Sequence, residues 1–216
     1  MPRNPAPLVI PLAKPVDVVP EGSLRQLRAE AADCRACPLW RNATQTVFGQ
    51  GPARARIMLI GEQPGAQEDL QGLPFVGPAG QLLRDLLSEA GVDGKRVYLT
   101  NTVKHFKFQQ RGKVRLHNRA NASEQAACRP WLAAELQRLR PRWIVALGAM
   151  AAQTLFGNAF RITRERGQWH ALGPSEAMAS WHPSAILRMS GPDRDAARAQ
   201  LLADLRALAE RSARQP

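Results

Sequence analysis

The stretch RIMLIGEQPG, residues 56–65, decides the fold class of this chain. Its first half is a short apolar run, which is typical of a buried strand, and its second half holds two glycines, which indicate a tight loop. Similar apolar runs follow downstream, and they are VYLTN at 97–101, RWIVALG at 142–148 and AMASW at 177–181. We predict that all four runs are strands.

Helical patterns fill the intervals between these strands. PAGQLLRDLLSEAG at 78–91 has leucines at 82, 83, 86 and 87, which is the spacing of an amphipathic helix. We predict a second helix at 122–139 with Ser123 as its N-cap, and a closing helix at 193–212. The alternation of strands and helices predicts a three-layer α/β/α sandwich around a short parallel sheet.

The domain is expected to begin near Ser23, the predicted N-cap of a short helix. Residues 1–22 carry six prolines and show neither a helical nor an alternating period. We therefore expect 1–22 to be a flexible tail or linker and 23–216 to form one domain.

The charge balance indicates the kind of partner. Lys and Arg number 30 against 18 Asp and Glu, a formal net charge of +12, which predicts a polyanionic partner such as nucleic acid. At 44% hydrophobic residues, the composition excludes a wholly disordered protein. No apolar run reaches the ~18 residues of a membrane span. We expect a monomer that is cytoplasmic, associated with the nucleoid and without a membrane partner.

The topology also predicts where a ligand binds. In parallel α/β sheets, ligands bind at the carboxyl ends of the strands. The segments expected there are Gly61–Gly65, Asn101–Lys104 and His182–Ser184. We expect the functional site at these three loops.

Taken alone, GEQPG is an ordinary strand-to-helix turn that needs glycine. Together with LTNTVKHFKF, VALGAMAAQTLFG and SWHPS, in this order, it resembles the uracil-DNA glycosylase superfamily. The resemblance is to the iron–sulfur members, family 4 and the related UdgX group, and runs from about Cys34 to the closing helix. It implies excision of uracil from DNA, with single-stranded DNA preferred.

The resemblance assigns roles at the strand ends. Asn101 is expected to read the polar edge of uracil, because a side-chain amide both donates and accepts hydrogen bonds. Phe75 is expected to stack on the ring, although ordinary core packing is the alternative. His182 occupies the position of the donor to O2 of the leaving base. Glu62 is expected to stabilise the positively charged sugar, orient a water or hold a nucleophile.

Gln63 and His117 point toward UdgX in particular. Gln63 stands where family 4 has a glycine in GEGPG, and KVRLH (113–117) resembles the KRRIH loop of UdgX. In UdgX the loop histidine attacks the sugar after uracil leaves, so His117 is the expected nucleophile, whereas an isolated loop histidine is usually an ordinary polar residue. The resemblance also implies substrate-binding residues, which are Gly61, Pro64, Gly65, Arg115 and Ser184.

The three cysteines cannot all pair, so a metal site or free thiols are expected. Cys34 and Cys37 have the spacing of a metal-binding pair, and Cys128 lies far downstream. Family 4 has a further cysteine where this chain has His105, so the resemblance implies a [4Fe-4S] cluster held by these four residues, with a structural role. Zinc, or three buried thiols beside a surface histidine, are the alternatives.

Two other functions remain open from the sequence. One is a glycosylase of family 4 type that turns over, in which water replaces His117 as the nucleophile. The other is a DNA-binding module without catalytic activity, which keeps the basic surface. Asn101 and His182 argue against the second, because a module that only binds DNA needs no pair of groups for the uracil edge.

Overall fold

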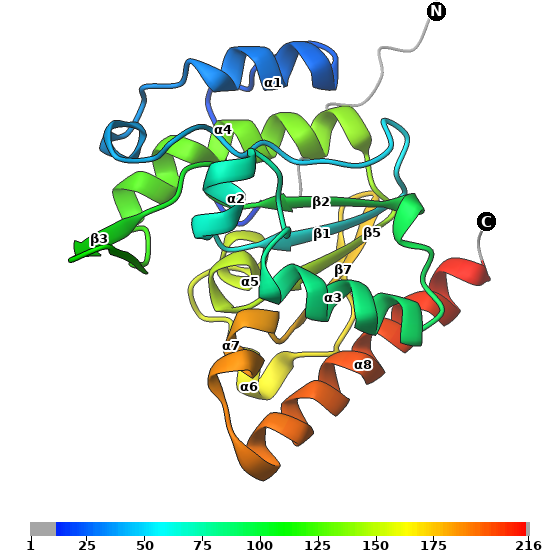
Figure 1. Cartoon of the computed structure of the whole chain (residues 1–216). Helices are drawn as coiled ribbons and strands as arrows, with labels where there is room; N and C mark the ends of the chain where they lie inside the picture. The colour runs from blue at the N-terminus through cyan, green and yellow to red at the C-terminus, as the bar shows by residue number, and fades with distance from the viewer. Residues whose placement is uncertain (1–11, 215–216) are drawn as a thin grey trace, which may run out of the picture.

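In a computed structural model of the chain, residues 12–214 are described, and they form a central five-stranded sheet (Figure 1). The strand order is β2-β1-β5-β7-β6. The strands are β1 (Ile57–Gly61), β2 (Val97–Asn101), β5 (Trp143–Leu147), β6 (His170–Leu172) and β7 (Ser175–Ser180). All neighbours pair in parallel except β6, which runs antiparallel to β7 at one edge.

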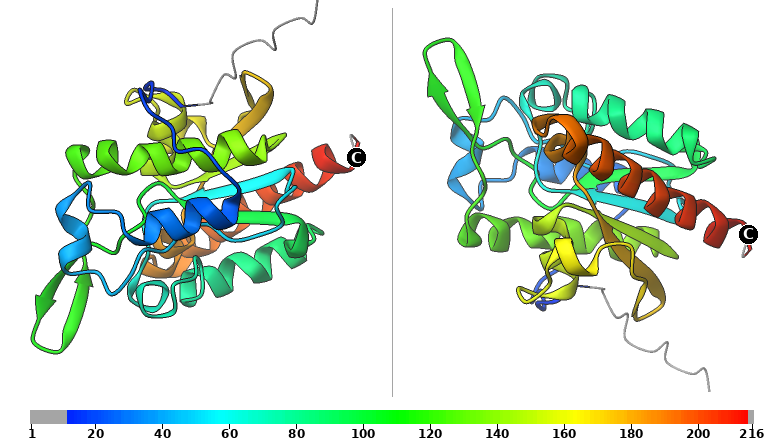
Figure 2. Two further views of the ribbon diagram at one scale, coloured as in Figure 1. Left: turned by 90° about the horizontal axis from the view of Figure 1, so that it is seen from above. Right: turned by 90° about the horizontal axis from the view of Figure 1, so that it is seen from below.

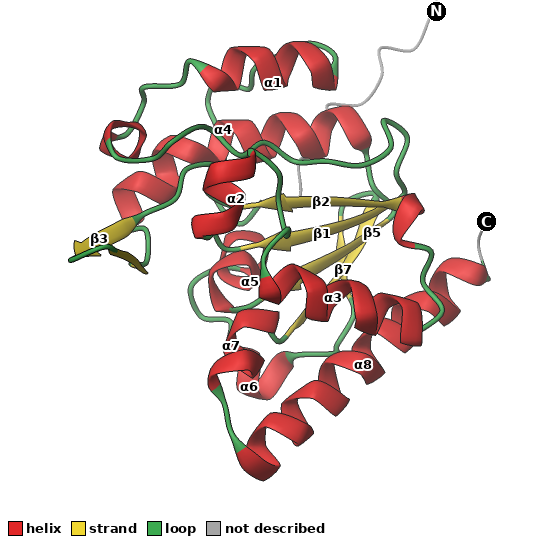
Figure 3. Cartoon of the chain, in the orientation of Figure 1, coloured by secondary structure: helices red, strands yellow, loops and turns green. Residues whose placement is uncertain are grey.

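Helices cover both faces of this sheet (Figures 2 and 3). On one side lie α3 (Pro78–Glu89), α7 (Pro183–Arg188) and α8 (Gly191–Ala213). On the other lie α4 (Ala122–Leu139) and α5 (Ala149–Phe156), with α1 (Leu24–Ala32) packed against α4. None of the helices between residues 12 and 214 is long and apolar enough to cross a membrane.

The side chains of β1 show why this strand is apolar throughout. Ile57 and Leu59 pack in the core beneath α3 and α8, whereas Met58 and Ile60 pack in the core beneath α4. Successive residues of a strand point to opposite faces, so a sheet covered on both faces needs apolar residues at every position. The predicted three-layer α/β/α sandwich is confirmed.

A two-stranded hairpin projects from this body between β2 and α4 (Figure 2). Its strands are β3 (Phe108–Arg111) and β4 (Val114–His117). The segment KVRLH (113–117), which the family resemblance describes as a loop, instead contributes its last four residues to β4. Most of the hairpin is exposed on both faces, so its residues carry no apolar alternation that marks a strand.

Short elements complete the chain. They are the helices α2 (Ala66–Gln71) and α6 (Ile162–Glu165), and the 3-10 turns at Pro38–Arg41 and Gly94–Arg96. Residues 12–22 form no helix or strand, although the Ala13 amide donates to the Thr154 carbonyl at 3.0 Å. The rest of the predicted tail, residues 1–11, lies outside the described residues.

One of the two predicted helix caps is confirmed and the other is wrong. Ser23 caps α1, and Gln26 returns a hydrogen bond to its backbone. The predicted cap Ser123 is wrong, because Asn121 caps α4 and accepts from the Glu124 amide. Glu124 in turn accepts from the Asn121 amide, so the pair forms a capping box, and the helix has its predicted bounds, Ala122–Leu139.

A buried ion pair joins α4 to the loop after β2. The Lys104 ammonium lies 2.6 Å from the Glu135 carboxylate, and both side chains are almost completely buried. Glu135 also accepts from the Tyr98 and Thr100 hydroxyls and from the Gly49 amide. Burial and the neighbouring Glu135 charge raise the pKa of Tyr98, so its hydroxyl remains a donor. Four donors therefore depend on one carboxylate.

Glu135→Gln should lower the free energy of unfolding by about 3 kcal/mol, because it leaves the buried Lys104 ammonium without a counter-charge. Urea denaturation at pH 7 measures this. The matched control is Glu89→Gln, which breaks an exposed pair with Arg198 and should cost less than about 0.5 kcal/mol. Equal losses in the two variants would show that the buried pair contributes no more than a surface pair.

Candidate active site

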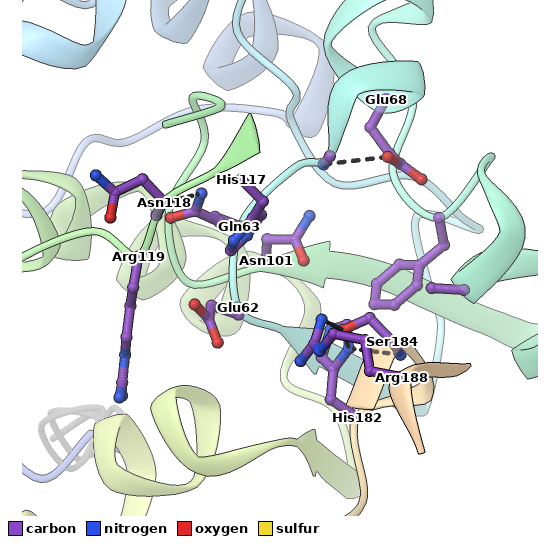
Figure 4. Close-up of a pocket in the computed structure, with 13 residues that line it drawn as sticks. Glu62, Gln63, Glu68, Asn101, His117, Asn118, Arg119, His182, Ser184 and Arg188 are labelled. Atoms are coloured by element: carbon purple, nitrogen blue, oxygen red, sulfur yellow. Dashed lines mark hydrogen bonds between the residues drawn. The ribbon is translucent and has the colours of Figure 1, made fainter. Parts of the chain in front are cut away.

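A pocket of about 530 Å³ lies at the carboxyl ends of the parallel strands (Figure 4). This is the edge at which the sequence analysis placed the site. Predicted site residues that line it are Glu62, Gln63, Gly65, Phe75, Asn101, His117, His182 and Ser184. Gly61, Pro64 and Arg115 were also predicted, but they do not line this pocket.

Gly61 nevertheless shapes the pocket, because it pairs with Asn101 where β1 and β2 end. A Cβ atom at Gly61 would collide with the Asn101 amide oxygen and lie 2.7 Å from the Phe75 ring. The missing side chain therefore leaves room for both groups. The Asn101 side chain is only 3% exposed, and among residues 12–214 its amide has no hydrogen-bond partner. It is thus free to bind a ligand.

Phe75 forms one wall of the pocket, and its backbone has a left-handed φ of 57°. The Arg84 guanidinium donates to its carbonyl at 2.6 Å, which helps to hold this uncommon conformation. The Phe75 ring faces that of His182 at a centroid distance of 6.1 Å and an angle of 25°. The two rings therefore form adjoining surfaces of the site.

His182 caps α7, and its hydrogen bonds fix the position of its proton. Nδ1 accepts from the Ser184 amide at 3.1 Å, so the proton of the neutral ring is on Nε2. Nε2 is buried and has no partner among the described residues. Burial, together with the positive charge of Arg188, lowers the pKa of His182 to about 4. The ring is therefore neutral at pH 7 and has an unused N–H donor.

His117 ends β4, and Gln63 holds the base of its hairpin. The Gln63 amide nitrogen donates to the Lys107 carbonyl at 3.2 Å and to the Asn118 carbonyl at 3.0 Å. Its oxygen accepts from the Ala120 amide at 3.0 Å. All three polar contacts of this buried side chain thus connect the two ends of the hairpin. Gln63 therefore holds the base of the hairpin that carries His117, and it also lines the pocket.

The surroundings of His117 keep its ring neutral. Burial lowers the pKa of His117, while the nearby Glu62 carboxylate opposes this shift and Arg188 adds to it. Figure 4 shows Glu62 and Asn101 between the His117 loop and the turn that carries His182. A neutral imidazole and a carboxylate therefore line the same cavity.

Arg115 holds the hairpin against α2 rather than lining the pocket. Its guanidinium lies 2.6 Å from the Asp69 carboxylate, which is completely buried, and donates to the Ala66 carbonyl at 3.1 Å. It also lies over the rings of Phe106 and Phe108, at 5.5 and 5.3 Å. Arg115 therefore acts on the site by fixing the strand that ends in His117.

The sequence analysis did not single out Glu68, which organises the loop after β1. Its carboxylate accepts from the Gly65 amide at 3.1 Å and from the Gly77 amide at 2.7 Å. The Glu three residues after Gly65 is the spacing of a capping box, which is the signal that was available. Pro64 is buried within this turn. The other pocket residues that were missed are Ala79, Asn118, Arg119 and Arg188.

The three cysteines form a second cluster, which we call the cysteine corner: Cys34 and Cys37 after α1, and Cys128 in α4. Burial raises the pKa of Cys128 to about 12, and the nearby Cys37 and Cys34 add to this effect. The Trp131 indole donates to Cys34 Sγ at 3.3 Å, and the Lys104 amide donates to Cys128 Sγ at 3.1 Å.

His105 is buried, and its hydrogen bonds also define its tautomer. The Thr46 hydroxyl donates to the Ala31 carbonyl, so it accepts from His105 Nε2 at 2.9 Å. The lone pair is then on Nδ1, and burial lowers the pKa of His105, which keeps the ring neutral. A neutral imidazole with one nitrogen held by a hydrogen bond is the usual form of a metal-binding histidine.

Comparison with known proteins shows the family of this chain. A sequence profile described as the uracil DNA glycosylase superfamily matches residues 48–206, which is most of the chain. The chain belongs to this superfamily. The predicted resemblance to the uracil-DNA glycosylase superfamily is confirmed.

Individual members of the superfamily are similar over most of their length. A type-4 uracil-DNA glycosylase of Thermotoga maritima is 41% identical over 159 residues, which cover 72% of this chain and 78% of the relative. A type-4 enzyme of Pyrobaculum aerophilum is 36% identical over 173 residues, 76% and 85% of the two chains. A type-5 uracil-DNA glycosylase of the same organism is 28% identical over 171 residues, 69% and 72% of the two chains. These relatives support the type-4 resemblance and do not support UdgX specifically.

His182 should remain neutral until the pH approaches 4, because its buried ring binds a proton less readily than in the unfolded chain. Between pH ~6.5, the ordinary histidine pKa, and pH 4, His182 is protonated in the unfolded chain but not in the folded one. Protonation then stabilises the unfolded chain, so the free energy of unfolding decreases as the pH falls through this range. Nitrogen-detected NMR titration measures the pKa and the tautomer. Titration near 6.5, or a proton on Nδ1, would contradict this description of the ring.

Proposed function

We propose that this protein excises uracil from DNA. The observation that carries the proposal is that two polar groups without hydrogen-bond partners among residues 12–214, the Asn101 amide and the Nε2–H of His182, line one pocket beside the Phe75 ring. The free amide of Asn101 suits the polar edge of uracil, which offers two carbonyls and an N–H. The Phe75 ring supplies a flat surface for a base turned out of the DNA stack.

The chemistry requires stabilisation of charge on both fragments. When the bond between the sugar C1′ and uracil N1 breaks, its electron pair stays with uracil and the sugar becomes oxocarbenium-like. The Nε2–H of His182 is available as a donor to the developing charge on uracil O2. The Glu62 carboxylate lines the same pocket and stabilises the positively charged sugar.

We further propose that His117 captures the sugar. A ring nitrogen of neutral His117 donates its lone pair to C1′ and forms a new C–N bond, while its other nitrogen releases a proton to Glu62 or to solvent. Three features support this step: His117 lines the pocket, desolvation lowers the pKa of its ring, and Gln63 and Arg115 hold its hairpin. The type-4 relatives favour the alternative, in which water attacks C1′ and the enzyme turns over.

Uracil-containing DNA in single-stranded form is the proposed substrate. The base of a single strand needs no unpairing before it enters the pocket. The net charge of +12 supplies attraction to phosphate. Exposed cations that make no ion pair among residues 12–214 include Arg119, which lines the pocket, and Arg111 and Lys113, which lie at the tip of the hairpin.

The cysteine corner and His105 are proposed to hold a [4Fe-4S] cluster. Three thiols and a neutral imidazole with a lone pair on Nδ1 are donors that suit iron–sulfur groups. Among the described residues, no three His, Cys, Asp or Glu side chains converge as the ligands of one metal ion do. When bound, the cluster would fix α1, α4 and the loop after β2 to one another.

His117→Ser should abolish the covalent product and retain uracil release, because serine lacks the imidazole lone pair but leaves room for water. The measurement is a denaturing gel of protein mixed with a uracil-containing single strand, with thymine in place of uracil as the control. A heat-stable adduct that persists in the variant would remove His117 from this role. Free abasic DNA with the wild type and no adduct would identify an enzyme that turns over.

The purified protein should be brown and absorb near ~400 nm, as iron–sulfur thiolate centres do. His105→Cys should retain the absorbance and lower the reduction potential, because imidazole ligands raise the potential of such clusters relative to thiolates. Cys128→Ala should lose the absorbance. A colourless protein with one equivalent of zinc, measured by metal analysis, would contradict the proposed cluster.

A further inference from the structure

Lys104 is buried at the meeting point of the cysteine corner and the pocket. Its backbone amide donates to Cys128 Sγ at 3.1 Å, and its ammonium lies 2.6 Å from Glu135. Cys128 and Glu135 are seven residues apart on α4, which is two helical turns and places them on one face. Both ends of this residue are therefore attached to the same helix.

The other two protons of the ammonium point to the end of β2. One is donated to the Thr100 hydroxyl at 2.6 Å and the other to the Asn101 carbonyl at 2.7 Å. An ammonium has three donors, so each of them has an acceptor. The side chain is 1% exposed, which leaves no place for water to substitute for the lysine.

The backbone on the other side of Asn101 is fixed as well. The Thr102 amide and hydroxyl both donate to the Gly61 carbonyl, at 3.0 and 2.8 Å. The peptide between Asn101 and Thr102 is therefore held at its carbonyl by Lys104 and at its amide by β1. Fixing this peptide fixes the Cα of Asn101, from which the free side-chain amide extends into the pocket.

We propose that Lys104 is a positioning residue, which holds the Asn101 amide in the orientation that reads uracil and fixes it to α4 and Cys128. This inference rests on the proposed function of the pocket. A displacement of about 1 Å at a reacting centre is enough to slow a reaction roughly 100-fold. The cysteine corner would then affect uracil recognition through one residue, because α4 carries both Cys128 and Glu135.

The stability of the fold does not by itself explain why the Lys104 ammonium is buried. Replacing a buried ion pair with uncharged groups of similar volume often leaves a protein as stable as before. An uncharged side chain, however, cannot donate three hydrogen bonds to Thr100, Asn101 and Glu135. The lysine supplies geometry at the strand end that a methionine of similar length does not.

Two variants separate positioning from stability. Glu135→Gln keeps the lysine and its bonds to Thr100 and Asn101, but removes the counter-charge. The double variant Lys104→Met with Glu135→Gln removes both the uncompensated charge and the bond to Asn101. We expect the double variant to unfold at a higher urea concentration than Glu135→Gln.

Uracil release should follow the opposite order. Measured in a single turnover at 25 °C with excess protein, Glu135→Gln should stay within about threefold of the wild type, and the double variant should be roughly 10- to 100-fold slower. The NMR signals of the Asn101 side-chain amide, recorded without DNA, should shift in the double variant and not in Glu135→Gln. The rate of uracil release and the NMR signals are both measured in the absence of urea.

The outcomes are distinct. Rates that follow stability, with Glu135→Gln the slower variant, would overturn the positioning role, and so would an Asn101 amide signal that is unchanged in the double variant. If the wild type releases no uracil, the proposed function fails, and the amide signal still decides whether Lys104 positions Asn101.

Discussion

The absence of a side chain at Gly61 is the constraint on which the pocket depends. Gly61 is in register with Asn101, and any Cβ there would collide with the Asn101 amide and crowd Phe75. The Gly61 carbonyl accepts from both the amide and the hydroxyl of Thr102. The end of β1 therefore also holds the end of β2, which carries Asn101. The polar and aromatic walls of the pocket can approach each other only because this position is glycine.

The hairpin that carries His117 depends on contacts outside its own strands. Two four-residue strands bury too little apolar surface to be stable alone. Gln63 joins its two ends, and Arg115 pairs with the buried Asp69 on α2. A buried carboxylate that loses its cation is costly, so the ion pair strongly favours the docked hairpin. The position of His117 is thus fixed by contacts between residues far apart in sequence: Arg115 and Asp69 are separated by 46 positions, and Ala120 and Gln63 by 57.

The sequence was sufficient for the four parallel strands and for the location of the site, whereas the antiparallel edge strand β6 was not predicted. Strands buried on both faces are apolar at every position, and the edge where parallel strands end follows from the topology alone. The hairpin was missed because exposed strands lack that pattern. The pairing of Arg115 with Asp69 was not predicted, because nothing in a sequence shows which carboxylate a cation contacts. The buried bonds of Lys104 were equally invisible, since a lysine is rarely buried and its three acceptors come from two elements.

The two histidines of the pocket have a common property and different tasks. Burial lowers the pKa of both His182 and His117, so neither adds a positive charge next to a sugar that becomes positive itself. An imidazolium at either position would repel that sugar and would have no lone pair to offer it. Ser184 occupies Nδ1 of His182, which leaves only a donor on this ring, whereas His117 lies beside the Glu62 carboxylate, which can accept its proton. Neutrality together with these different neighbours would separate the proposed donor, His182, from the proposed nucleophile, His117, within one cavity.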